Sequence, residues 1–587
     1  MWVVATAGHV DHGKSTLVRA LTGMEPDRWA EERRRGMTID LGFAWTTLPS
    51  GGTLAFVDVP GHERFVPNML AGVGPVPAAL IVVSADEGWM PQSAEHLAAL
   101  DALGVSYGLL AVTRADLADP GPATARARAE IAATSLGEVE AVAVSAVTGA
   151  GLPELRAALD RLVARLPDPA HDAPVRLWVD RSFTVRGSGT VVTGTLGGGR
   201  LRVGDELELA ATGEPVRVRG LHSLGFARSD VDAVARVAVN LRGLPRDRVG
   251  RGDALLRPGR FGRTDLLDVR LAGDPAADLP ATLTLHVGSA AVPARVRPLG
   301  PDTVRLRLAR PLPLLIGDRA LLRDPGRHHV AGGVTVLDVD PPPLRRRGAA
   351  AARAAVLAGL DGRPDPVGEL RRRRLVRAGQ LARMGVPPAA TPVAGDWLAD
   401  PDHWRDLGRR LTEEVARYAA EHPLAAGVPL DALRHRLGLP DRALVTALLR
   451  PPLRLHAGLV TAAPAVTLPD PVARAVATVR AEYGDRPFQA PEAHHLAGLG
   501  LGPKEIGAAV RAGALVRLAE NVVLLPGAPD DAARVLAGLP QPFTLSAARQ
   551  ALGTTRRVAV PLLELLDRRG LTRRLPDDAR EVVRPPG

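Results

Sequence analysis

The sequence predicts a multidomain chain in which an α/β domain precedes two antiparallel β-barrels and a tandem array of small helical domains. Three observations support this architecture. Strand-like and helical segments alternate up to about residue 165, the helical period disappears from about 175 to 340, and helix-rich units recur beyond 343. At 587 residues the chain is too long for one hydrophobic core, so several domains are required.

The first predicted domain, 1–172, contains short apolar runs such as TLAFVDV and AALIVVSA, separated by amphipathic segments such as AEHLAALDALG. This alternation is typical of a parallel sheet covered by helices on both faces. The proline-rich segment LPDPAHDAP ends the pattern, because prolines neither continue helices nor pair within sheets. We therefore place the end of the domain within this segment.

The next two predicted domains, 173–259 and 260–342, lack helical periodicity. Strand-like pieces such as GTVVTGTL, PVRVRGL and TVRLRLA recur between Gly, Pro and Asp turns. Their spacing predicts two antiparallel barrels or sandwiches with a seam near 257–263. The following PPPLRRRG run indicates a stiff linker, because consecutive prolines hold an extended backbone.

Beyond this linker the chain contains a weak internal repeat. Helix-rich units end in short strands near VAGDW, GLVTA, NVVLL and EVVRP, at intervals of roughly 60 residues. This length suits a helix-turn-helix unit with a β-hairpin wing. We predict four winged helices, and one large helical domain is the alternative. The predicted units are 343–407, 408–467, 468–527 and 528–587.

Composition restricts the function classes. With 46% hydrophobic and 24% charged residues the chain is typical of a globular protein, and no long uncharged apolar run predicts a membrane span. The N-terminus lacks a basic signal-peptide region and the chain has no cysteine, which favours a cytoplasmic location. A formal net charge of +10 weakly favours a polyanionic partner.

The first nucleotide motif is GHVDHGKST, which matches G-x-x-x-x-G-K-[ST] between a predicted strand and a predicted helix. Its glycines let backbone N–H groups turn toward phosphate oxygens. Lys14 would reach the β and γ phosphates, and Ser15 would supply a hydroxyl to Mg²⁺. Among 74 lysine and arginine residues only Lys14 and Lys504 are lysines, which indicates that this cradle needs a compact ammonium. The predicted phosphate-binding residues are Gly8, His9, Val10, Asp11, His12, Gly13, Lys14, Ser15, Thr16 and Gly61.

Two further segments predict a GTPase. RRRGMTID places Thr38 in a charged stretch, where its hydroxyl would coordinate Mg²⁺ only while the γ phosphate is present. In DVPGHERF, Asp58 would hold Mg²⁺ through water and the Gly61 N–H would contact the γ phosphate. The adjacent His62 is the predicted catalytic residue that positions the attacking water. The predicted metal-binding residues are Ser15, Thr38 and Asp58, and the predicted ligands are GTP or GDP with Mg²⁺.

The base-binding residues are predicted from the ends of two later strands. Asp116 in VTRAD would accept hydrogen bonds from the guanine N1 and N2 groups, and only guanine offers this pair of donors. Ser145 and Ala146 in SAVTG would lie near the base. With the phosphate loop and the switch residues, these segments form an α/β P-loop GTPase domain.

The motifs GHVDHGKST, RGMTID, DVPGHE, RAD and SAVTG, in this order and spacing, resemble the translational GTPases of the elongation factor Tu class. DRSFTVRGSGTVVTGTL with LRVGDE resembles the second domain of that class, and RDPGRHHVAGGVTVLD resembles the end of its third domain. The additional helix-rich third, with MTIDLGFAW and LLELLDRRGLTRR, makes the whole chain similar to the bacterial selenocysteine-specific elongation factor (SelB) family. The resemblance implies ribosome-stimulated hydrolysis of GTP to GDP and phosphate.

One departure from the family concerns the guanine motif, which is usually N-K-x-D. This chain has Thr113 and Arg114 in place of the Asn and Lys. Loss of the Asn is expected to weaken a contact between the base loop and the phosphate loop and so to lower nucleotide affinity. The stem or guanidinium plane of Arg114 would cover the base. The predicted guanine-binding residues are Thr113, Arg114, Asp116, Ser145 and Ala146.

The resemblance also implies an amino-acid pocket formed by Phe43, Arg181 and Arg236. A selenol is more acidic than a thiol or a hydroxyl and is ionised at neutral pH. Two arginines would therefore hold it by charge-assisted contacts that serine cannot form. The alternative is that these arginines are simply solvated, as most arginines in a barrel are.

The last predicted winged helix is a candidate RNA-binding unit. GTTRRVAVPLLELLDRRG reads as a recognition helix with Arg556 and Arg557 in its first turn. Arg573 and Arg574 would fall on the wing. These arginines would hold phosphates of an RNA hairpin, and the alternative is a solvated charged face. The family resemblance implies that the hairpin is the selenocysteine insertion element of an mRNA.

The favoured hypothesis is therefore a monomeric elongation factor that delivers selenocysteyl-tRNA to the ribosome at UGA codons while bound to an mRNA hairpin. A general translational GTPase is one alternative, although the helix-rich third would have no role in it. A nucleotide-regulated winged-helix DNA-binding protein is another, because winged helices read DNA more often than RNA. Neither alternative is excluded by the residues alone.

Overall fold

A computed structural model describes residues 1–26, 40–60, 66–73, 76–327, 329–388, 390–462, 468–576 and 578–583. The chain forms two compact units. The first comprises Met1–Glu369 with Val376–Ala390, and the second comprises Leu370–Leu375 with Thr391–Gly587. Among the helices described, none combines the length and apolar character that crossing a lipid bilayer requires.

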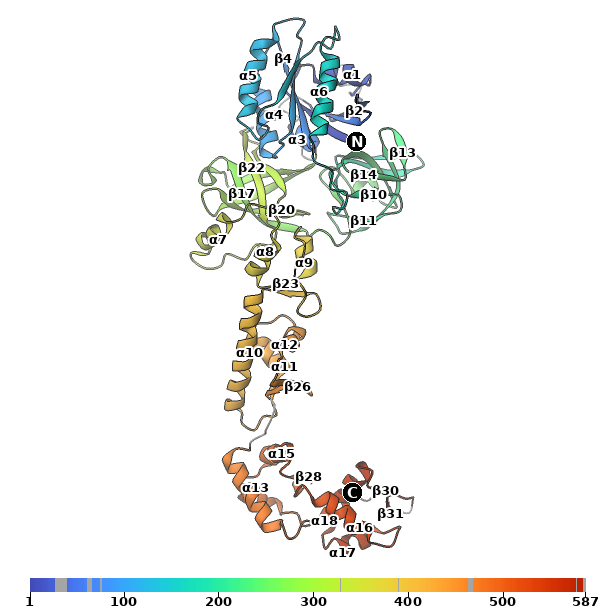
Figure 1. Cartoon of the computed structure of the whole chain (residues 1–587), viewed down its shortest axis with the longest axis vertical. Coiled ribbons are helices and arrows are strands. Elements are labelled where there is room, and N and C mark those ends of the chain that lie inside the picture. Colours follow the sequence, from blue (N-terminus) through green and yellow to red (C-terminus); the bar gives the residue numbers. More distant parts are fainter. Residues whose placement is uncertain are drawn as a thin grey trace. The chain divides into compact units, whose positions relative to one another are not determined.

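The N-terminal domain is a six-stranded sheet between two layers of helices (Figure 1). Its strands are β1 (Trp2–Ala7), β2 (Gly42–Thr47), β3 (Thr53–Asp58), β4 (Ala78–Ser84), β5 (Gly108–Thr113) and β6 (Glu140–Ala143), in the order β2-β3-β1-β4-β5-β6. Its helices are α1 (Lys14–Thr22), α3 (Val66–Val73), α4 (Pro91–Ala102), α5 (Pro120–Ala132) and α6 (Leu152–Ala164). The β2–β3 pair is antiparallel and the other pairs are parallel.

Helices cover both faces of this sheet, which explains why β4 is apolar and buried along its whole length. Leu17 of α1 and Leu155 of α6 pack on one face, and Met69 of α3 and Ile131 of α5 pack on the other. The sheet therefore places the carboxyl ends of β1, β3, β4 and β5 along one edge, the position where ligands bind in open α/β sheets.

The second domain is an antiparallel barrel. Its elements are β7 (Arg176–Trp178), β8 (Arg181–Val185), β9 (Gly189–Leu196), β10 (Arg200–Arg202), β11 (Glu206–Leu209), β12 (Pro215–Ser223), β13 (Phe226–Arg228), β14 (Asp230–Asp232), β15 (Ala235–Arg242), η2 (Arg246–Arg248) and β16 (Ala254–Leu256). Six strands run in the order β11-β16-β7-β9-β15-β12, and a β11–β12 pairing closes the ring. Burial alternates strictly along β15, because every second side chain faces the barrel interior.

The third domain is a closed barrel in the order β17-β20-β19-β18-β21-β22. Its elements are β17 (Thr264–Gly273), η3 (Ala276–Asp278), β18 (Thr282–Val287), β19 (Ala290–Pro298), β20 (Thr303–Leu312), β21 (Arg319–Asp324) and β22 (His329–Asp338). The predicted fold class is confirmed: an α/β GTPase-type domain, two six-stranded antiparallel barrels and a C-terminal winged-helix part. The bounds of the seven predicted domains stay predictions.

Helix α7 (Ala349–Ala358) follows the third domain and is fixed on it by buried ion pairs. Arg353 donates to Asp268 and to Asp338 at 2.6 Å each, and Arg305 donates to the other oxygen of Asp268 at 2.6 Å. Removing one member of such a buried network typically costs about 3–5 kcal/mol, because the remaining charges stay buried without compensation. The chain is therefore anchored to the barrel after the proline-rich run.

The remaining chain is helical with short hairpins. Its elements are α8 (Pro366–Arg373), β23 (Leu375–Arg377), α9 (Ala378–Arg383), β24 (Trp397–Ala399), α10 (Pro401–Glu421), β25 (Val428–Pro429), α11 (Leu430–Leu437), α12 (Arg442–Leu448), β26 (Leu453–His456), β27 (Leu459–Ala462), α13 (Asp470–Tyr483), α14 (Ala493–Gly498), α15 (Pro503–Arg511), β28 (Val516–Ala519), β29 (Val522–Leu524), α16 (Ala528–Ala537), α17 (Leu545–Ala551), α18 (Arg556–Arg568), β30 (Thr572–Arg574) and β31 (Arg580–Val582). The hairpins β26–β27, β28–β29 and β30–β31 are antiparallel.

The elements from α16 to β31 show why this part of the sequence folds as a winged helix. Val558, Leu562 and Leu566 lie on one side of α18 at spacings of four residues and are buried. Burying each such side chain stabilises the fold by about 1.5–3 kcal/mol. They pack on α16 and α17 within one core, and the β30–β31 hairpin follows as the wing.

Candidate functional site

The phosphate loop lies between β1 and α1, at the edge formed by the carboxyl ends of the parallel strands. Gly8 has φ = 143°, and a Cβ atom there would lie 2.1 Å from the carbonyl oxygen of Val82. Gly13 precedes α1 with φ = 79°. Both positions therefore require glycine, one because of a close approach to β4 and both because L side chains avoid positive φ.

The side chain of Lys14 is buried inside this loop. Its Nζ donates to the carbonyl oxygens of Gly8 at 3.0 Å and His9 at 2.6 Å. Burial lowers the pKa of Lys14 to about 8, although the carboxylates of Asp58 and Asp11 oppose this shift. The ammonium is thus confined to the cradle in which phosphate oxygens would become its partners.

Helix α4 holds the loop from the other side, a role that the sequence did not reveal. The Gly8 N–H donates to Nδ1 of His96 at 3.0 Å, and the Val10 N–H donates to Oε1 of Gln92 at 3.2 Å. Gln92 and His96 are four residues apart, so they share one face of α4. That spacing is the only signal in the sequence, and it does not show which loop the face contacts.

The histidines near the loop are neutral. Burial lowers the pKa of His96 to about 3, with the charges of Lys14 and His9 adding to the effect. Burial, followed by the charge of His9, lowers the pKa of His12 to about 4. A neutral His96 can accept the Gly8 N–H through Nδ1, whereas a protonated ring cannot.

These histidines predict loss of stability in mild acid. Their folded-state pKa values lie below the unfolded value of 6.5, so the unfolded chain binds more protons and stability falls as the pH drops below 6.5. Each histidine contributes up to about 1.4 kcal/mol per pH unit. We expect hydrogen-exchange protection of β1 and β4, corrected for intrinsic rates, to fall between pH 7 and 5.5. The change should be smaller in His96→Gln, which keeps an acceptor but does not titrate. An equal change in both proteins would contradict the assignment.

Ser15, in the first turn of α1, lies beside Asp58, the last residue of β3. Ser15 Oγ donates to Asp58 Oδ2 at 2.6 Å, and Thr6 Oγ1 donates to Asp58 Oδ1 at 2.8 Å. A hydroxyl and a carboxylate are the hard oxygen donors that suit Mg²⁺, so this pair fits the ion chemically. Three further predicted residues, Thr38, Gly61 and His62, lie outside the described residues.

The base loop and the phosphate loop are in contact, although replacement of the family's Asn by Thr113 was expected to weaken this contact. Thr113 Oγ1 donates to the His12 carbonyl oxygen at 2.8 Å, so Thr113 itself links the base loop to the phosphate loop. Arg114 forms ion pairs with Asp86 at 2.8 Å and Glu87 at 3.0 Å and also donates to the Asp11 carbonyl. The guanidinium therefore reinforces the same link.

The other predicted base-binding residues follow β5 and β6. Asp116 is exposed, and within the described part of the chain no side chain pairs with its carboxylate. The Ser145 hydroxyl accepts the Thr148 N–H at 3.1 Å, which closes the loop that also contains Ala146. The Ala115 N–H donates to the Val144 carbonyl at 3.2 Å and joins the two loops.

The three residues of the predicted amino-acid pocket are brought together. Arg236 of β15 lies 3.8 Å and Arg181 of β8 lies 5.3 Å from the ring centre of Phe43 in β2. They line a cavity of about 210 Å³ between the first and second domains, with Trp45 and His222 also on its wall. Cations over an aromatic face are stabilised by the ring quadrupole.

Two carboxylates that sequence reasoning missed hold these arginines. Asp180 receives two hydrogen bonds from Arg236, one of them 2.7 Å long, and its side chain is only 5% exposed. Asp40 lies 2.9 Å from Nε of Arg181, which also donates to the Leu41 carbonyl. Asp180 adjoins Arg181 in the sequence, but nothing there indicates that it pairs with a strand 56 residues away.

The four predicted RNA-binding arginines lie on α18 and its wing. Arg556 is exposed in the first turn, without a side-chain partner in the described ranges. Arg557 donates to Glu492 at 3.0 Å and to the Pro491 carbonyl at 3.2 Å. Arg573 pairs with Glu581, and Arg574 with Asp578 at 2.8 Å. Three of the four thus have protein partners, all on exposed surface.

Comparison with known proteins gives three matches to family models. The Elongation factor Tu GTP binding domain matches residues 1–165. The beta-barrel domain of the selenocysteine-specific elongation factor matches residues 265–343, and the Elongation factor SelB winged helix matches residues 534–580. The selenocysteine-specific elongation factor of Escherichia coli is 35% identical over 478 residues, which cover 76% of this chain and 75% of that protein.

The chain belongs to the selenocysteine-specific elongation factor family. The factor of that name from Desulfomicrobium baculatum is 39% identical over 336 residues, or 55% of this chain and 53% of that protein. The crystal structure of a bacterial selenocysteine-specific elongation factor, EF-Sec, is 26% identical, with a TM-score of 0.75, and the match covers 99% of this chain and 100% of that one. This member of the family is therefore a translational GTPase that binds guanine nucleotides.

The link through Thr113 predicts how this GTPase retains its nucleotide. Thr113→Val keeps the shape but leaves the His12 carbonyl without its donor, at a cost of about 1–2 kcal/mol. We expect fluorescently labelled GDP to dissociate roughly 5- to 30-fold faster in a stopped-flow displacement assay. Thr113→Ser retains the hydroxyl and serves as the matched control. Unchanged dissociation from the valine variant would show that the link does not hold the base loop.

Proposed function

We propose that this factor carries selenocysteyl-tRNA to the ribosome in a GTP-dependent cycle while its C-terminal part holds an mRNA hairpin at a UGA codon. The observation that carries this proposal is the pair of guanidinium groups over Phe43. An ionised selenol placed in that cavity would meet two cations, whereas the smaller serine hydroxyl offers no charge. Discrimination would therefore rest mainly on charge.

Asp40 and Asp180 shape this selectivity. Without a ligand they neutralise Arg181 and Arg236 and fix the orientation of both side chains. A selenolate that joins the cluster shares positive groups that are already desolvated and positioned, so little reorganisation is required. A neutral side chain gains none of this electrostatic energy.

The nucleotide part of the cycle uses the residues of the phosphate loop. Lys14 would exchange its two loop carbonyls for phosphate oxygens, and Ser15 and Asp58 would hold Mg²⁺ together with Thr38. Bound Mg²⁺ would supply charge neutralisation at the β and γ phosphates. Gly61 would contact the γ phosphate, and His62 would position the attacking water.

Asp40 is the first described residue after the segment that contains Thr38, and it pairs with Arg181. A contact of Thr38 with Mg²⁺ in the GTP-bound state would therefore be transmitted to the amino-acid pocket. We expect selenocysteyl-tRNA to bind at least 100-fold more tightly with a non-hydrolysable GTP analogue than with GDP, a coupling of about 3 kcal/mol. Fluorescence titration of labelled tRNA measures both constants, and equal affinities would refute a GTP-dependent cycle.

The proposed binding of the mRNA hairpin is tested by substituting a predicted RNA-binding arginine of α18. Arg556→Ala is expected to weaken binding of the mRNA hairpin by roughly tenfold and to lower the salt slope of log K by about 1, as loss of one phosphate contact requires. Filter binding of the full chain at several salt concentrations gives both values. Arg454→Ala is the control, because Arg454 is another exposed arginine of the second unit whose side chain has no partner among the described residues. Equal or tighter binding to duplex DNA of the same length would favour a DNA-binding role.

A further inference from the structure

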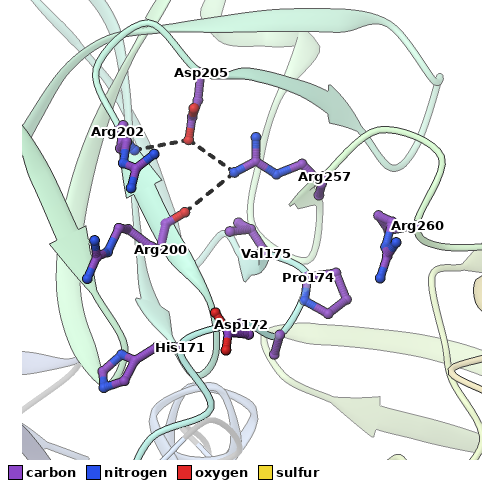
Figure 2. A pocket seen from close by; sticks show the side chains of 10 residues that line it. His171, Asp172, Pro174, Val175, Arg200, Arg202, Asp205, Arg257 and Arg260 are labelled. Carbon is purple, nitrogen blue, oxygen red and sulfur yellow. Dashed lines mark hydrogen bonds and ion pairs between the residues drawn. The ribbon is translucent and has the colours of Figure 1, made fainter. Parts of the chain in front are cut away.

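The second domain contains a basic cavity to which none of the sites above assigns a role (Figure 2). It has a volume of about 510 Å³ and is lined by Arg200, Arg202, Arg257, Arg260 and His171, against the acidic residues Asp172 and Asp205. Its walls come from three stretches of chain: the segment before β7, strand β10 with the turn after it, and the segment after β16. The cavity thus lies where the chain enters and leaves the second barrel.

Two of the arginines are held in fixed positions. Arg257 donates to Asp205 at 3.2 Å, and Asp205 also accepts the Arg202 backbone N–H at 3.0 Å. Arg200 donates twice to Asp232 across the β10–β14 pair, with one hydrogen bond of 2.9 Å. Asp205 and Asp232 thus fix the orientation of the two guanidinium groups. Each guanidinium retains further N–H groups that do not contact these carboxylates.

The other two arginines are free to accept a ligand. The side chains of Arg202 and Arg260 form no hydrogen bond or ion pair within the parts of the chain that the structure describes, and both are exposed. Arg200 and Arg202 project on the same side of β10, because they flank the buried Leu201. Figure 2 shows Arg260 across the cavity from this pair.

The lining determines the class of ligand. Planar guanidinium groups bind phosphate oxygens, and the two unpaired ones, Arg202 and Arg260, lie beside two that are already paired with carboxylates, so the cavity can contact more than one phosphate. Phe, Tyr and Trp are missing from the lining, so the cavity offers no stacking platform for bases. The site would therefore bind a nucleic acid backbone independently of its sequence.

We propose that this cavity binds neighbouring phosphate groups of a structured RNA backbone. The choice of RNA over an acidic protein rests on the function proposed above, in which the factor carries a tRNA to the ribosome, whose surface presents RNA phosphates. Such a contact would restrict the motion of the second domain, because it involves residues of the segments before β7 and after β16. It would add affinity that depends on salt and not on RNA sequence.

The experiment uses site-specific crosslinking in the full chain. The protein contains no cysteine, and Val203, adjacent to Arg202, is 46% exposed, so Val203→Cys accepts one thiol-linked photo-crosslinker. The probes are 70S ribosomes and, separately, a tRNA transcript, each with a non-hydrolysable GTP analogue. We expect crosslinks to RNA from at least one probe, reduced at least tenfold when Arg202→Ala and Arg260→Ala are added.

Controls separate this site from general charge effects. Arg295→Ala with Arg297→Ala removes two exposed arginines of β19 in the third domain and should leave the crosslink unchanged, since neither side chain has a partner in the part of the chain that the structure describes. The salt slope of log K for the crosslinked RNA should fall by about 2 in the Arg202/Arg260 variant only. Crosslinks only to ribosomal protein, or RNA crosslinks that persist without the two arginines, would overturn the proposal. Complete competition by micromolar pyrophosphate would instead indicate a site for free anions and would also overturn it.

Discussion

Arg236→Ala is expected to remove most of the preference of this factor for selenocysteyl-tRNA over seryl-tRNA, by roughly 100-fold or about 3 kcal/mol. Arg236 is the guanidinium nearest to Phe43, at 3.8 Å from the ring centre. Its removal also leaves the buried Asp180 carboxylate without its ion pair, with the Thr193 hydroxyl still donating to it at 2.7 Å, and this less compensated charge would repel a selenolate. Fluorescence titrations with both charged tRNAs in the presence of a GTP analogue measure the preference.

Two further variants make this result interpretable. Asp180→Asn combined with Arg236→Gln removes both charges, so it tests the loss of the cation without an uncompensated carboxylate. Arg228→Ala removes an arginine that lies 5.9 Å from the ring of Phe226 in the same domain but outside the cavity. We expect the double variant to lose the preference and Arg228→Ala to retain it. A parallel loss of affinity for both tRNAs would indicate a structural role for Arg236 and contradict the charge-based account.

Lys14→Arg is expected to lower affinity for GTP and GDP on the order of 100-fold, which corresponds to about 3 kcal/mol. The Lys14 ammonium fits between the Gly8 and His9 carbonyls, and the side chain is buried. A planar guanidinium is larger and cannot approach two phosphates as a point charge. Equilibrium binding of labelled nucleotide and single-turnover hydrolysis on ribosomes measure the effect.

Arg114→Lys is the matched control, because it makes the opposite exchange in the same nucleotide site. Arg114 is partly exposed and reaches Asp86, Glu87 and the Asp11 carbonyl, contacts that a lysine ammonium can replace in part. We expect nucleotide affinity to change by less than about fivefold, since exposed ion pairs contribute little. Normal GTP hydrolysis by Lys14→Arg would refute the idea that the cradle requires a lysine.

The architecture could be predicted because each of its parts depends on local pattern. The continuous apolar run of β4, the alternation along β15 and the spacing of Val558, Leu562 and Leu566 are visible in the sequence. The phosphate loop is equally local, since its glycines and Lys14 lie within seven residues. The fold and the nucleotide motif could therefore be predicted from short-range sequence patterns.

Other features depend on contacts between distant residues and were not predictable. His96 meets Gly8 from 88 residues away, and Asp180 reaches Arg236 across 56 residues. The same limit applies to Arg557, which was predicted to hold RNA phosphates and is found bonded to Glu492. Sequence showed which residues carry charge, whereas only the fold shows which charges already have partners.

The central claim is that charge in the Phe43, Arg181 and Arg236 pocket selects selenocysteine. Titration of the factor with selenocysteyl-tRNA and with seryl-tRNA, both made on the same tRNA and with the same GTP analogue, tests it most directly. Because the two ligands differ only in one chalcogen atom and its charge, we expect affinities that differ by at least 100-fold. Equal affinities would contradict the account.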